Sequence, residues 1–117
     1  MRRTCTIERN CVRVAVAMLA ETGGAPDDPF VLARQYRIRL HPRERSGAMI
    51  RGLHLYYDRD CSREEQARMV AACVATHGLR RHGQRVTPGA VRRVANLITG
   101  ALGNGRSSAS ASAASGF

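Results

Sequence analysis

The stretch S-R-E-E-Q-A-R-M-V-A-A-C-V-A-T-H-G-L-R-R-H-G, residues 62–83, predicts one long helix around which the rest of the chain is organised. Ser62 is a good N-cap residue, and Glu65 three positions later completes a capping box. Apolar residues then recur at helical spacing and form a stripe that needs a core to pack against. The residues of this stripe are Ala67, Val70, Ala71 and Val74.

Cys73 and His77 are four residues apart in this helix, so they lie one turn apart on the same face. A helix presents two zinc ligands in this relation. The alternative to a zinc site is that both residues are structural. Cys73 would then fill space in the core, and His77, near the helix C-terminus, would interact with the last carbonyls. A metal site would need further ligands, and the nearest candidates in the sequence are His54, Cys61 and His82.

Two helices are predicted before the strands. The first covers residues 6–22 and ends at Gly23-Gly24, and the second runs from Asp28 as N-cap and Pro29 as first helical residue to about Tyr36. The residues expected to face inward are Ile7, Cys11, Val12, Ala15, Val16, Met18 and Leu19 in the first helix, and Phe30, Val31 and Leu32 or Ala33 in the second.

Three short strands are predicted next, at residues 37–40, 48–51 and 53–57, with His41-Pro42 ending the first of them. Because side chains alternate along a strand, His54 and Tyr56 should point to the face opposite to that of their neighbours. The neighbours expected on the inner face are Leu53, Leu55 and Tyr57.

A last helix begins at Thr87 and Pro88 and is expected to reach about Leu102, with one apolar stripe. The residues of that stripe are Val91, Val94, Ala95, Ile98 and Leu102. Residues 103–117 are rich in Ser, Ala and Gly and predict a flexible tail. The chain therefore predicts a single α+β domain over residues 1–102, with a small antiparallel or mixed sheet packed with about four helices.

The stretch A-C-V-A-T-H-G-L, residues 72–79, resembles A-H-E-x-x-H-x-L, the active-site helix of the ImmA/IrrE family of zinc metallopeptidases. Ala72, His77 and Leu79 match the family motif, whereas Cys73 replaces its first histidine and Val74 its glutamate. Residues 30–40 and 52–58 resemble the segments that precede the motif in that family, and residues 91–98 resemble the helix that follows it. In that later helix the family supplies an acidic third ligand, but no Asp or Glu follows Glu65 here.

This resemblance implies a zincin-like scaffold with altered chemistry. A peptidase of this type uses three protein ligands for zinc and a glutamate as general base. Val74 cannot accept a proton, so we expect a catalytically degenerate domain that acts as a regulatory or protein-binding module. It is expected to hold either no cofactor or a residual zinc ion at Cys73 and His77. Active members of the family cleave repressor-type regulators, and the resemblance implies a regulator of that type as the protein partner.

The charge of the chain supports a second hypothesis. All 19 basic side chains are arginine, only nine are acidic, and the net charge is +10. Such a charge favours nucleic acid or an acidic protein as a partner, although a solvated basic surface gives the same composition. The arginines proposed to bind nucleic acid or another anion are Arg37, Arg39, Arg43, Arg45, Arg51, Arg80, Arg81, Arg85, Arg92 and Arg93. They would form one groove if the strands and the last helix share a side.

The sequence also predicts where the protein is located and whether it belongs to an assembly. The apolar fraction of 44% suits a globular domain, and neither a membrane span nor a secretory signal is recognisable. Four cysteines without a C-x-x-C pair are then expected to be reduced thiols in the cytoplasm. A third hypothesis for function is a structural component of a phage-like particle or another assembly.

Overall fold

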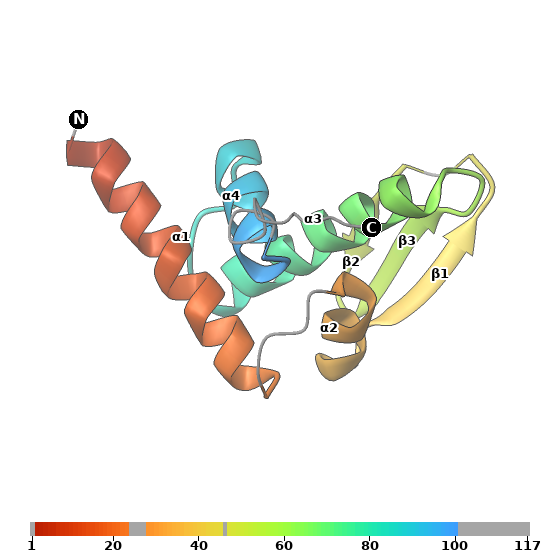
Figure 1. Ribbon diagram of the computed structural model, residues 1–117, viewed down its shortest axis with the longest axis horizontal. Coiled ribbons are helices and arrows are strands. Elements are labelled where there is room, and N and C mark those ends of the chain that lie inside the picture. Colours follow the sequence, from red (N-terminus) through yellow and green to blue (C-terminus); the bar gives the residue numbers. More distant parts are fainter. Residues whose placement is uncertain (1, 24–27, 46, 101–117) are drawn as a thin grey trace, which may run out of the picture.

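The computed structural model describes residues 2–23, 28–45 and 47–100, with side chains from Ile7 onward. Over these ranges it contains four helices and a three-stranded mixed sheet, which confirms the α+β class (Figure 1). The elements are α1 (Arg2–Glu21), α2 (Pro29–Gln35), β1 (Arg39–Arg43), β2 (Met49–Arg51), β3 (His54–Asp58), α3 (Arg63–Arg81) and α4 (Pro88–Ile98). None of the helices in these ranges has both the length and the apolarity to cross a bilayer. The predicted tail lies outside the described residues.

Helix α3 is the centre of the fold. Figure 1 shows α1 and α4 at one end of it and the sheet at the other, with α2 alongside. Its buried residues cover almost every turn from Val70 to Leu79 and pack against all of these elements. The sheet therefore packs on the 62–83 helix, as the sequence predicts.

The sheet has the strand order β1-β3-β2, with β1 parallel and β2 antiparallel to the central β3. Leu40, Ile50 and Leu55 occupy one row across the three strands and contribute to the core. A two-residue turn links β2 to β3, and Gly52 supplies its positive φ of 60°. Leu53 lies in this turn and is exposed, so the prediction that it faces inward is wrong.

Helix α1 buries a narrower stripe than the sequence predicts. Cys11, Val14, Ala15 and Met18 are buried at the spacing of one helix face, whereas Ile7, Val12 and Val16 are exposed by 56%, 39% and 60%. The apolar residues of α1 spread over more of the helix circumference than its packing on α3 and α4 can cover. The pattern of apolar residues in the sequence therefore does not by itself show which of them are buried.

Side-chain caps define three of the helix starts as predicted. The Phe30 N–H donates to Asp28 Oδ1 at 2.9 Å, and the Glu65 N–H donates to Ser62 Oγ at 3.2 Å. At α4, the Ala90 N–H donates to Thr87 Oγ1 at 3.1 Å. Each bond satisfies an N–H that has no partner inside its own helix, which is why these boundaries are readable from sequence.

Other boundaries differ from the predictions. Helix α1 begins at Arg2 rather than Thr6, and β1 continues through Pro42 to Arg43. Strand β1 is an edge strand, where proline is tolerated because its missing N–H can face away from the sheet. Helix α4 ends at Ile98, because Gly100 adopts a left-handed φ of 69°.

Helices α2 and α3 end in the same hydrogen-bonded turn with different residues at its left-handed position. After α3, Gly83 has a φ of 69°, and its N–H and that of Gln84 donate to carbonyls of the last turn. After α2, Arg37 occupies the equivalent position with a φ of 62°, and its N–H and that of Ile38 donate in the same way. Glycine is the usual residue there, since a Cβ disfavours this conformation by about 1–2 kcal/mol.

We expect Arg37→Gly to raise the free energy of unfolding by about 1 kcal/mol, because glycine relieves the left-handed backbone. The matched change Gly83→Ala should lower it by a similar amount. Urea denaturation of the two variants beside the unaltered protein measures both effects. A loss of stability in Arg37→Gly would contradict the assigned turn.

Gly78 lets α1 approach α3 closely. A Cβ at this position would overlap the Met18 side chain from Sδ to Cγ, and both residues are buried. Glycine is otherwise unfavourable in a helix interior by about 1 kcal/mol relative to alanine. Its presence in the middle of α3 therefore has a packing reason.

We expect Gly78→Ala to destabilise the protein by about 1 kcal/mol, because the steric cost of about 1–3 kcal/mol exceeds the gain in helix propensity. In a Met18→Ala background the same substitution should be neutral or stabilising, since the space is then free. A double-mutant cycle by chemical denaturation measures this coupling. Stabilisation by Gly78→Ala in the unaltered protein would refute the close contact.

Candidate functional site

Cys73 and Val74 lie in the core of the domain. Cys73 is 5% exposed, and burial raises the pKa of its thiol to about 11. The thiol is therefore protonated near neutral pH, whereas zinc binds the thiolate. Val74, which the sequence resemblance aligns with a catalytic glutamate, is completely buried and packs with the other apolar residues of the core.

His77 lies at the edge of a polar cluster formed by the ends of α1, α2 and α3. Its ring contacts the Tyr36 ring edge-on, with 5.1 Å between centroids. The Tyr36 hydroxyl donates to Glu21 Oε1 at 2.6 Å, and Arg81 and His82 each approach the Glu21 carboxylate at 3.2 Å. One carboxylate thus joins α1 to the cap of α2 and to the last turn of α3.

The electrostatics of this cluster follow from its contacts. Partial burial alone would raise the pKa of Glu21, but hydrogen bonds from Tyr36, Arg81 and His82 lower it. Burial, followed by the hydrogen bond to Glu21, raises the pKa of Tyr36 well above its ordinary value. Burial, followed by the charge of Arg81, lowers the pKa of His77 below 6.5. The imidazole of His77 is therefore held neutral beside a tyrosine that remains a phenol.

The candidate additional ligands lie in separate contacts. His54 Nδ1 shares a hydrogen bond with His41 Nε2 at 3.0 Å, Cys61 Sγ donates to an Asp58 oxygen at 3.3 Å, and His82 pairs with Glu21. In the part of the chain that the structure describes, no three His, Cys, Asp or Glu side chains gather as a metal site. With Cys73 enclosed by core side chains and no third donor gathered beside it in the described residues, the donors present at α3 do not fit a zinc ion.

We expect the free energy of unfolding to decline as the pH falls below the ordinary histidine pKa of 6.5, because of His77. Its pKa is lowered in the folded state, so its contribution is present above the ordinary value of 6.5 and is lost as the pH falls through the lowered pKa. His77→Gln should show a shallower decline in urea titrations across this range, while His54→Gln serves as the control for removal of an exposed histidine. An unchanged slope in His77→Gln would contradict this assignment.

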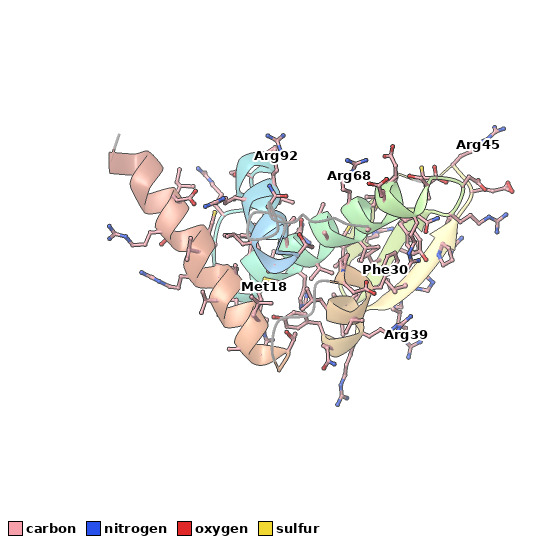
Figure 2. The ribbon with its side chains drawn as sticks, in the orientation of Figure 1. Met18, Phe30, Arg39, Arg45, Arg68 and Arg92 are labelled. Carbon is pink, nitrogen blue, oxygen red and sulfur yellow. The ribbon has the colours of Figure 1, made fainter. Side chains whose placement is uncertain are left out.

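An apolar groove of about 540 Å³ lies between α3 and α4, beside the start of α2. Small side chains form it, because alanines of α3 face α4 and leave a trough between the two helices. Arg68 and Arg92 border it and project to the same side of the molecule (Figure 2). The other lining residues are Pro29, Ala67, Ala71, Ala72, Pro88, Val91, Ala95, Asn96 and Thr99.

The ten predicted anion-binding arginines do not form one groove. Those of β1, β2 and the adjoining turns lie at the sheet end of α3, whereas those of α4 lie toward α1 (Figures 1 and 2). Two of them are used within the fold, since Arg81 pairs with Glu21 and Arg93 with Glu8. Arg80, Arg85 and Arg92 are exposed on the helical side, so the sheet carries a separate basic surface.

The sheet end also contains one residue, His41, that the sequence did not indicate as a candidate for binding. His41 was predicted to end a strand, but it lies within β1 and its ring stacks on Tyr56 with 4.9 Å between centroids. The parallel pairing of β1 with β3 places His41 opposite Tyr56. Alternation along 53–57 gave the face of His54 and Tyr56, but no local signal indicated the parallel partner.

Comparison of the chain with protein-family models, with curated proteins and with solved structures found no significant match. The similarity of residues 72–79 to the ImmA/IrrE motif therefore stays a prediction from sequence. The features of the fold that bear on function are the contacts of α3, the groove between α3 and α4, and the surface of the sheet.

Proposed function

We propose that this chain is a catalytically degenerate zinc-peptidase-like domain that acts as a regulatory, protein-binding module in the cytoplasm. The observation that carries the proposal is the apolar groove between α3 and α4. It lies beside a helix in which Cys73 and Val74, aligned by resemblance with a zinc ligand and a catalytic glutamate, are core residues. By resemblance to the ImmA/IrrE family, the partner is a repressor-type regulator that is bound without being cleaved.

The chemistry of α3 supports the degenerate part of the proposal. A general base in a zinc peptidase must reach the metal-bound water, but Val74 carries no basic atom and is fully buried. Cys73 is a protonated thiol at neutral pH because burial raises its pKa to about 11. These positions stabilise the fold by filling the core.

The groove supports the binding part of the proposal. Its floor of alanine and valine side chains suits an apolar segment, and its two border arginines suit acidic residues that flank such a segment. Arg92 is in no ion pair within the described residues, and Arg68 has only a long contact of 3.9 Å with Glu65. Their charge is therefore available to a partner. The proposed occupant is a partner segment with apolar anchors and acidic flanks.

Metal content tests the degenerate part. We expect elemental mass spectrometry of protein purified without chelator and without a His-tag to find far less than one zinc per chain. The double variant Cys73→Ala/His77→Ala should give the same value. Near-stoichiometric zinc that disappears in the double variant would overturn this part, as would cleavage of a repressor that depends on His77.

Selection from a displayed library of short random peptides tests the binding part. The enriched peptides should combine apolar anchors with acidic flanks, and synthetic fluorescent copies should bind at least about fivefold more weakly to Arg68→Glu/Arg92→Glu. Arg34→Glu/Arg85→Glu changes the net charge equally at exposed positions away from the groove. A bulky side chain in Ala72→Met should also weaken binding, whereas Ala20→Met on α1 should not. Equal loss in the matched variants would refute the groove as the binding site.

A further inference from the structure

The outer face of the sheet presents side chains in cross-strand rows. The register places His54 between Arg39 and Arg51 in one row, and Tyr56 between His41 and Met49 in the next. These side chains alternate with the row of Leu40, Ile50 and Leu55 that packs on the core, so they lie on the face away from α3. The sheet is open on that side, because Arg39, Met49, Arg51 and His54 are all exposed.

Three aromatic rings form a continuous platform on this face. The His41 ring stacks on Tyr56 at 4.9 Å with an interplanar angle of 20°, and it lies beside the His54 ring, with 5.2 Å between centroids and an angle of 29°. The hydrogen bond between the two imidazoles, at 3.0 Å, holds them in this arrangement. Arg43 extends the platform, since its guanidinium lies over the Tyr56 ring at 5.3 Å.

The platform is surrounded by arginines that are free of acidic partners. Within the described residues, none of Arg37, Arg39, Arg43, Arg45 and Arg51 is in an ion pair. Of the neighbouring acids, Glu44 pairs with Arg59 at 3.0 Å, whereas Asp58 lies opposite Arg43 in the register and accepts hydrogen bonds from the Asp60 N–H and the Cys61 thiol. The five arginines outnumber these acids, so the local charge is positive.

The backbone gives an independent indication that these arginines matter. Arg37 and Arg45 flank β1, and both have a left-handed φ, of 62° and 48°. Glycine would be favoured at such positions, and α1, α3 and α4 are each followed by a glycine with positive φ. Backbone strain of this kind is concentrated at functional sites, where the side chain has a role that offsets its cost.

We propose that the outer face of the sheet binds single-stranded nucleic acid, independently of the groove between α3 and α4. Unpaired bases stack on the His41, His54 and Tyr56 rings, and the arginines of β1 and β2 contact the phosphates. Aromatic rings on an open sheet face with interleaved cations suit unpaired bases, because the bases of a duplex are already stacked on each other. A shallow hollow of about 530 Å³ on this face gives an unpaired base room to lie. It is lined by Arg43, Glu44, Met49, Arg51 and Tyr56.

Fluorescence anisotropy with a labelled oligouridylate and a labelled oligothymidylate tests the proposal on the full chain. We expect binding that weakens steeply with salt, and weaker binding to a duplex of equal length. The triple variant Arg39→Ala/Arg43→Ala/Arg51→Ala should reduce affinity for the single strands by about tenfold or more. The control Arg9→Ala/Arg13→Ala/Arg85→Ala removes the same charge from exposed positions away from the sheet and should have a much smaller effect.

Stacking is tested separately from charge. Tyr56→Leu keeps an apolar side chain but removes the aromatic ring, and should weaken single-strand binding by roughly 5- to 100-fold. Thermal melting by circular dichroism reports whether the variant is folded, and His41→Leu replaces it in the test if it is not.

Four outcomes would overturn the proposal. These are no binding of single strands at low salt, equal losses in the two triple variants, affinity for duplex or heparin equal to that for single strands, and unchanged affinity in a folded ring variant. Equal losses would mean that net charge alone attracts the oligonucleotide. Preferential loss in the sheet variants, with a loss on removal of the ring, would establish the site.

Discussion

The rest of the structure depends on one constraint, which is that other elements pack against both ends of α3. One helix contacts α1 and α4 at one end and the sheet at the other, with α2 alongside. Small side chains make this possible, since Ala71, Ala75 and Gly78 bring neighbouring elements close to the helix axis. The place of Met18 against Gly78 shows how little space remains, because even one methyl group would meet a fully buried side chain.

The same packing accounts for the chemistry of the candidate site. A residue that must fill the core cannot also be an accessible ligand or base, and Cys73 and Val74 are core residues. His77 is further from the centre of the core, but its ring lies against Tyr36 and its imidazole is kept neutral. Glu21 is the acidic residue in this region, and it is engaged by Tyr36, Arg81 and His82. Cys73, Val74 and His77 thus each have a structural role in α3.

The positive charge of the chain divides into structural and available arginines. Arg59, Arg81 and Arg93 pair with acids from other elements and join parts of the fold. The arginines of β1 and β2 have no such partner among the described residues, and they surround an aromatic platform. The apolar groove lies between α3 and α4, whereas the platform lies on the outer face of the sheet. The two proposed binding surfaces are therefore separate and can be disabled one at a time.

Local signals in the sequence determined much of the framework and part of the candidate site. The caps at Asp28, Ser62 and Thr87 were predictable because each is a hydrogen bond between residues two or three positions apart. The common face of Cys73 and His77 follows from helix periodicity, and that of His54 and Tyr56 from strand alternation. The α+β class follows from the order of the elements.

Only the tertiary structure decided which of these residues meet. The apolar residues of α1 compete for one buried stripe, and the partners on α3 and α4 select Cys11, Val14, Ala15 and Met18. The parallel pairing of β1 with β3, which brings His41 onto Tyr56 and His54, joins strands separated by β2 in the chain. The distribution of arginines over two sides of the domain depends on the same long-range contacts. Hydrogen bonds within a turn are specified by neighbouring residues, whereas contacts between distant segments depend on how the whole core packs.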